Sequence, residues 1–214
     1  LGKQKDSWVN VWQYFSNAPH KYPKVIKYLD QATPKDLGTG MFKLPEESWP
    51  SFNAKKEKEL EVALKKLANK TTSEAHDALI NLYEDHKVRL QWIWAELGNS
   101  QFAISLPYLL QLSELSRKSY NNSSMEGLTT YYAEEGYKVD SALRNLALSS
   151  STKEHMEMVT KMTALFYLPW VTKLTQSFQH LAKEDTKKII DLNISKAIEG
   201  AEFILFVDAF RYDL

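Results

Sequence analysis

Apolar side chains recur at alternating steps of three and four residues through "TTSEAHDALINLYEDHKVRLQWIWAELG", residues 71–98. This is the period of an α-helix that buries one face, so the segment predicts one amphipathic helix. Thr71 and Glu74 stand in the relation of a capping box at its start, and Gly98 is a typical C-terminal stop. At 1.5 Å per residue such a helix would be roughly 40 Å long, and we expect it to be the spine of the domain. Its expected core-facing residues are Ala75, Leu79, Leu82, His86, Leu90, Ile93 and Leu97.

Three further segments also predict helices. Residues 53–69 place Leu60, Leu64 and Leu67 on one side of a helix, and the alternating charges of "KKEKELEVALKK" mark its solvated side. "ISLPYLLQLSELSRKSY" predicts a helix with Ser105 as N-cap and Pro107 tolerated in the first turn. Residues 128–148 predict two short helices interrupted near the glycine of "EEGY".

A further long helix is predicted over residues 151–182. Ser151 and Glu154 form the pattern of a second capping box. Pro169 should kink or split the helix, because proline removes a backbone donor and its ring clashes with the preceding turn. The residues expected on its buried face are Val159, Met162, Phe166, Trp170, Leu174, Phe178 and Leu181.

The first part of the chain predicts a separate group of short helices. Trp8, Val11, Trp12 and Phe15 fall on one helical face that needs a partner surface. Glycines and prolines mark a loop over residues 33–53. We therefore expect a mainly α fold, a bundle of about seven to nine helices. Residues 1–53 form N-terminal helices and a loop, residues 54–183 the bundle, and residues 184–200 a charged linker.

Composition narrows the functional classes. Lys plus Arg and Asp plus Glu number 27 each, so no bulk charge attracts nucleic acid or anionic membrane, although a local basic patch stays open. Cysteine is absent, which excludes a thiolate zinc site and a cysteine nucleophile. No apolar run reaches the ~20 residues of a membrane span, and the first residues lack a secretory leader, so we expect a cytoplasmic protein with no membrane contact. His76 and His86 are too far apart on one helix to share a metal.

The segment "EFILFVDAFRYDL", residues 202–214, differs from the rest of the chain. Its five-residue apolar run predicts a strand covered on both faces, with Asp208 at the carboxyl end where α/β domains bind ligands. A haloacid dehalogenase site would need a second Asp where Phe210 stands, and a Walker B strand would need an acid where Ala209 stands. Two alternatives remain: the run is a final buried helix, or Asp208 caps a following helix.

The motif "VDAFRYD" resembles the first motif of the PglZ branch of the alkaline phosphatase superfamily, where a hydrophobic strand runs into Asp, a small residue, an apolar residue and Arg. PglZ proteins belong to the BREX phage-resistance systems of bacteria. The helical part is also similar to the region that precedes the catalytic domain in a group of these proteins. The segments that carry this similarity are "WQYFSNAPHKYPKVIKYL", "ESWPSFN", "DHKVRLQWIWAELGNSQFA", "YYAEEGYKVDSAL" and "YLPWVTKLTQSFQ".

The resemblance implies a role for the last residues. Residues 201–214 would begin a phosphatase-like α/β domain, in which Asp208 ligates zinc or another divalent metal and Arg211 and Asp213 orient the loop. The nucleophile and the other ligands would lie past Leu214, so we expect this chain to be part of a longer metal-dependent hydrolase. One carboxylate cannot hold zinc, and the chain alone should therefore bind no metal and be inactive.

The partners that the resemblance implies are other BREX defence subunits, with DNA and a second copy of the chain as further candidates. On this reading, the helical part scaffolds the catalytic domain and contacts those partners. The alternative is a stand-alone helical protein-interaction module with no enzymatic role.

Overall fold

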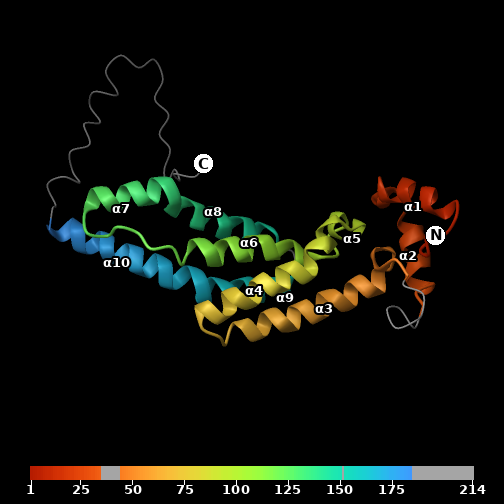
Figure 1. Cartoon of the computed structure of the whole chain (residues 1–214), viewed down its shortest axis with the longest axis horizontal. Helices are drawn as coiled ribbons and strands as arrows, with labels where there is room; N and C mark the ends of the chain where they lie inside the picture. Colours follow the sequence, from red (N-terminus) through yellow and green to blue (C-terminus); the bar gives the residue numbers. More distant parts are fainter. Residues whose placement is uncertain (35–43, 151, 185–214) are drawn as a thin grey trace, which may run out of the picture.

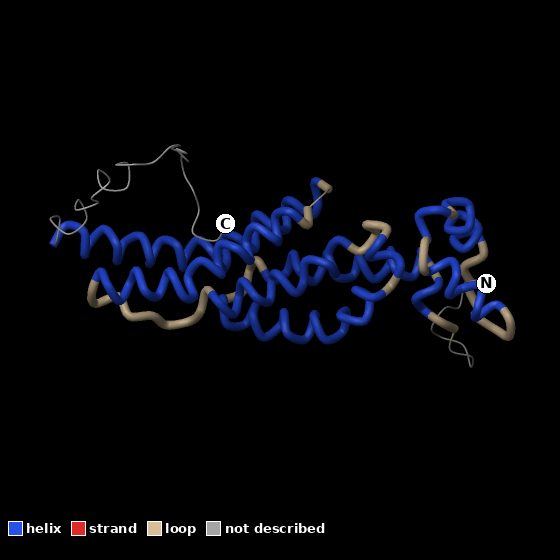
Figure 2. The backbone as a smooth tube through the Cα atoms, turned by 90° about the horizontal axis from the view of Figure 1, so that it is seen from above, coloured by secondary structure: helices blue, strands red, loops and turns tan. Residues whose placement is uncertain are grey.

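The computed structural model describes residues 1–34, 44–150 and 152–184, and all regular structure in these ranges is helical (Figure 2). If each pair joined by a π-helical turn counts once, the described residues form eight α-helices. The prediction of a mainly α helical bundle is confirmed. The predicted linker from residue 185 onward, the predicted strand and Asp208 lie outside the described residues.

The molecule is elongated, and a small N-terminal module lies at one end (Figure 1). The module contains α1 (Trp8–Ser16), a short 3-10 turn η1 (Pro19–Lys21) and α2 (Pro23–Gln31). Its apolar cluster unites Trp12, Phe15 and Leu29 with Ile93 and Trp94 of the short helix α5 (Ile93–Glu96), which together with the flanking Trp92 and Leu97 is called the α5 region.

The buried face expected on α1 is only half correct. Trp12 and Phe15 are buried, but Trp8 is 52% and Val11 43% exposed. The apolar residues that pack against this cluster come from α2, from the α5 region and from Leu1, and they cover the side of α1 that carries Trp12 and Phe15. Trp8 and Val11 extend beyond that cover.

The bundle is built around α6 (Gln101–Leu115), which packs against α4 (Thr72–His86) and α8 (Tyr137–Leu148). Leu106, Leu109 and Leu112 of α6 are fully buried. After the short turn η2 (Glu46–Ser48), α3 (Pro50–Leu67) adds Leu60 and Leu64 to the same core, as its leucine spacing predicts.

The predicted single helix over residues 71–98 is wrong in its second half. The capping box of Thr71 and Glu74 is present, but α4 ends at His86 and a 3-10 turn, η3 (Lys87–Gln91), follows. Trp92 is extended, with φ −78° and ψ 149°, and a separate short helix, α5 (Ile93–Glu96), comes next. The tighter turn brings Arg89 inside, where its guanidinium bonds to α3. At this point the chain forms the ion pair between Arg89 and Glu57, and the apolar face of α4 does not continue.

The helix containing Pro107 begins earlier than predicted. Its N-cap is Ser100, and Pro107 lies inside α6 and not in the first turn. The reason is Glu57 of α3, whose carboxylate accepts hydrogen bonds from the backbone N–H groups of Phe102 (2.9 Å) and Ala103 (3.3 Å). A carboxylate at this position satisfies donors that a helix start otherwise leaves open.

The last two helix pairs each contain a π-helical turn. α7 (Met125–Tyr131) passes through η4 (Tyr132–Gly136) into α8, which agrees with the predicted interruption near Gly136. α9 (Lys153–Met162) passes through η5 (Thr163–Tyr167) into α10 (Leu168–Glu184). The π turn stands directly before Pro169, where a regular turn would clash with the proline ring. Thr152 caps α9 through the His155 N–H, so the predicted cap Ser151 is off by one residue.

Candidate functional site

The described residues contain no group of three His, Asp or Glu side chains that could hold a metal ion. The predicted metal ligand Asp208, together with Arg211 and Asp213, lies outside the described ranges. His76 and His86 do not meet: His76 Nδ1 lies 2.9 Å from the Ser113 hydroxyl, whereas His86 contacts Arg89. The two histidines therefore have different partners.

A buried polar cluster joins α3, η3 and α6. The guanidinium of Arg89, 2% exposed, donates to the Asn53 side-chain oxygen at 2.7 Å and to the Glu57 carboxylate at 2.7 Å. Its Nη1 atom also lies 2.9 Å from His86 Nδ1. The Ser100 hydroxyl donates to Asn53 at 3.0 Å. These hydrogen bonds join side chains of α3 to η3 and to the start of α6, so the cluster holds the helices in place.

The electrostatics of this cluster follow from its burial. Burial, followed by the neighbouring charge of Arg89, lowers the pKa of His86 below its usual value. Arg89 carries no acceptor, so Nδ1 of His86 accepts its hydrogen bond and the imidazole is neutral.

An open cleft of about 500 Å³ lies beside the polar cluster, between α3 and the turn that joins α5 to α6. Glu57 and Glu61 line it, with Asp30 of α2 at its edge. Glu61 is bound by Lys58 at 2.7 Å and Lys65 at 2.6 Å, and these hydrogen bonds lower the pKa of its carboxyl group. Glu57 and Glu61 are already paired with Arg89 and with two lysines. These two carboxylates are therefore poorly placed to act as an acid, a base or a metal ligand in the cleft.

A second polar group lies where the two π turns meet. The Asp140 carboxylate accepts hydrogen bonds from the hydroxyls of Tyr132, at 2.6 Å, and Tyr167, at 2.7 Å. Tyr132 opens η4 and Tyr167 closes η5, so each π turn supplies one tyrosine to the same acid. Beside them, the rings of Tyr120 and Tyr131 stack with centroids 4.3 Å apart. The arrangement fastens α8 to the second helix pair.

An apolar groove of about 500 Å³ runs between α7 and α10. Phe178, on the predicted buried face of α10, is 44% exposed here, so that part of the prediction is wrong. The groove lies toward the end of the molecule where α10 finishes (Figure 1). Its lining residues are Leu128, Thr129, Tyr132, Ala133, Leu174, Thr175 and Phe178.

Sequence patterns gave no sign of the groups that matter most in these sites. Glu57 and Arg89 lie 32 residues apart, and a pairing over such a distance leaves no local signal. Asp140 is one acid among many on helix surfaces, and only the π turns bring two tyrosines to it. Among the indoles, Trp94 is buried and donates to the Glu47 carbonyl at 2.8 Å. Trp92 packs against Phe52 of α3, with ring centroids 6.4 Å apart, so the two indoles lie in different environments.

Within the described ranges no helix is long and apolar enough to cross a membrane. Comparison of the chain with models of known protein families, with curated proteins and with solved structures gives no match.

Proposed function

We propose that the chain is the helical scaffold region of a PglZ-type protein that acts in bacterial phage defence in the cytoplasm. The proposal is supported by the motif "VDAFRYD" and by the similarity of the helical segments to the region that precedes the catalytic domain in PglZ proteins. In this role the helices present a metal-dependent phosphoester hydrolase to other defence subunits and to DNA.

The observation that carries the scaffold role is the placement of the two ends. The N-terminal module lies at one end of the elongated molecule, and α10 finishes at the opposite end (Figures 1 and 2). One continuous apolar core, from Leu60 of α3 to Trp170 of α10, runs through the bundle between them. A rigid spacer of this kind holds whatever follows α10 away from whatever binds the N-terminal module.

The catalytic part of the proposal concerns Asp208. A carboxylate at the end of a strand would ligate zinc or another divalent metal, with further ligands supplied past Leu214 in the whole protein. A metal held in this way supplies a Lewis acid and an activated water for phosphoester hydrolysis.

The test is Asp208→Ala in the whole protein, with Asp191→Ala as a matched control outside the motif. Metal content is measured by mass spectrometry and hydrolysis with a chromogenic phosphodiester. We expect Asp208→Ala to lose bound metal and hydrolysis together, and Asp191→Ala to keep both. Retention of metal and activity by Asp208→Ala would refute the proposal.

The apolar groove between α7 and α10 favours one second candidate, a stand-alone interaction module. In that case the apolar run of residues 203–207 packs as a helix into the bundle. Hydrogen exchange on the 214-residue chain separates the two functions. Strong protection of residues 203–207, lost in Phe178→Glu, supports the interaction module, whereas fast exchange of these amides favours the scaffold proposal.

A further inference from the structure

Exposed aromatic side chains are concentrated on the N-terminal module. Of the five aromatic side chains recorded as exposed in the described residues, four belong to it. Trp8 is 52%, Tyr14 77%, Tyr22 50% and Tyr28 66% exposed. Exposed rings in such number need an explanation, because solitary surface apolar residues are common but clustered aromatics mark interaction sites.

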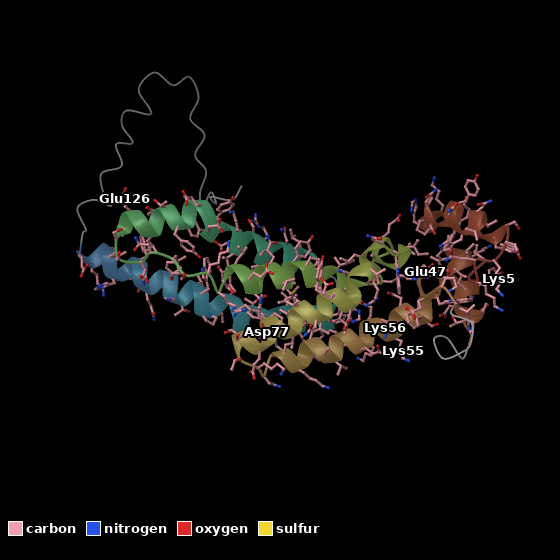
Figure 3. All side chains as sticks on the ribbon, viewed as in Figure 1. Lys5, Glu47, Lys55, Lys56, Asp77 and Glu126 are labelled. Atoms are coloured by element: carbon pink, nitrogen blue, oxygen red, sulfur yellow. The ribbon has the colours of Figure 1, made fainter. Side chains whose placement is uncertain are left out.

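Lysines accompany these rings. Residues 1–31 contain Lys3, Lys5, Lys21, Lys24 and Lys27, all exposed, against only two acids, Asp6 and Asp30. The chain as a whole has a formal charge of zero, so this end is positive and the rest of the molecule compensates with negative charge. Lys5 lies at the N-terminal end of the molecule, and Glu126 of α7 lies near the other end (Figure 3). Lysines therefore outnumber acids five to two in the N-terminal module.

The exposed rings lie on both helices, but the lysines lie only on α2, where Lys24 and Lys27 stand near Tyr28. On α1, Trp8, Val11 and Tyr14 follow one another at steps of three residues, which makes neighbours on a helix surface. On α2, Lys24 and Tyr28 are four residues apart and also neighbours. The ring of Phe15 contacts that of Tyr22, at 6.4 Å between centroids, and so joins the buried side of α1 to the start of α2.

We propose that this surface, formed by Trp8, Tyr14, Tyr22 and Tyr28 with Lys21, Lys24 and Lys27, binds single-stranded nucleic acid. Exposed rings stack on unpaired bases of any sequence, and adjacent lysines neutralise the phosphates. A duplex fits poorly, because its bases are already stacked and α1 carries no basic residue to follow a groove. The inference names the nucleic-acid partner of the proposed scaffold and does not depend on the metal site.

The test is fluorescence anisotropy of a labelled oligothymidylate of 20 nucleotides with the 214-residue chain, in EDTA and low salt. We expect saturable binding with a Kd of about 1–100 µM, the range of sequence-independent complexes. The variant Trp8→Ala/Tyr14→Ala/Tyr28→Ala should bind at least about tenfold more weakly, because each lost stack weakens binding severalfold. The matched control Val62→Ala/Leu148→Ala/Leu168→Ala, which removes exposed apolar side chains from the bundle, should bind like the wild type.

Charge is tested separately. Lys21→Glu/Lys24→Glu/Lys27→Glu should reduce the slope of log affinity against log salt by about 0.7 for each lysine that contacts a phosphate. Lys66→Glu/Lys70→Glu/Lys161→Glu, an equal charge change on exposed bundle lysines, should leave the slope unchanged. Circular dichroism checks that each variant is folded.

Three results would overturn the inference: no saturable binding below about 100 µM, equal weakening by the control variants, or equal affinity for a duplex of the same length. Binding of a polyglutamate peptide as tightly as the oligonucleotide would assign the surface to an acidic protein partner instead. Because EDTA removes divalent metal, failure here leaves the metal-site proposal untouched, and failure of Asp208→Ala leaves this one untouched.

Discussion

Arg89 and Glu57 form an ion pair of 2.7 Å in which the arginine is 2% exposed and the glutamate side chain 13%. The second carboxylate oxygen of Glu57 accepts the backbone N–H of Phe102 at the start of α6. One acid on α3 therefore neutralises a buried cation and satisfies a helix start. This pair explains why the chain turns sharply after His86, because Arg89 reaches Glu57 only from η3.

Arg89→Met should lower the free energy of unfolding by about 3–5 kcal/mol, because it leaves the Glu57 carboxylate without its buried partner. Urea denaturation measures the loss. Lys87→Met, which breaks a surface ion pair with Glu84, is the control and should change stability little, because water screens exposed ion pairs. Equal losses of unfolding free energy in the two variants would mean that the buried ion pair stabilises the fold no more than the surface pair does.

Asp140→Ala should lower stability by about 2 kcal/mol, since two tyrosine hydroxyls lose their charged acceptor but remain within reach of water. For a chain of this size the melting temperature should fall by roughly 4–8 °C. Asp77→Ala, on the exposed side of α4, should change it by less than about 2 °C. An unchanged melting temperature for Asp140→Ala would show that the tyrosines do not depend on this acid.

The protein should lose stability as pH falls from 7.5 to 5.5. Burial lowers the pKa of both His86 and His155 in the folded state. Below the ordinary histidine pKa of about 6.5, the unfolded chain therefore binds more protons than the folded one, and protonation favours unfolding. Urea denaturation at both pH values should show a smaller difference for His86→Gln/His155→Gln. The exposed His180→Gln should behave like the wild type, and an equal pH response in all three proteins would contradict the assignment.

Pro107→Ala should raise the free energy of unfolding by about 1–2 kcal/mol. Pro107 lies inside α6, where its missing N–H leaves a carbonyl one turn earlier unpaired, and alanine restores that bond. Part of the gain is offset because the unfolded chain becomes more flexible. Pro50→Ala is the matched control, since proline at the first position of α3 loses no helical bond and should give no gain. A loss of stability in Pro107→Ala would mean that its ring is needed for packing.

The spacing of apolar residues predicted the core correctly where helices pack against each other through apolar side chains alone. Leu60, Leu64 and Leu79 are fully buried, as their period requires. It failed where a distant polar partner decides the backbone. Arg89 ends a helix that the local pattern would continue, and Glu57 moves the start of α6 five residues ahead of the predicted cap Ser105.

The candidate sites were harder to predict for a related reason. Exposure of Trp8 depends on how far α2 and the α5 region cover α1, and no spacing within α1 contains that information. Asp208, the one residue that a motif identified, lies outside the described residues, and its role as a metal ligand stays a prediction. A local motif therefore gave the proposed metal ligand, whereas the exposure of the aromatic residues on α1 and α2 could be read only from the packed helices.

The paired π turns at Asp140 have a consequence for insertions and deletions. A π turn closes its hydrogen bond over one more residue than an α turn, so it shifts the helical phase of everything after it by about 100°. Deleting Ala133 to restore a regular helix would rotate Val139, Ala142 and Leu146 away from α6, although no core residue had been changed. The chain should therefore accept substitutions at exposed positions of η4 and η5, such as Glu134 and Ala164, but hardly any change in the length of either turn.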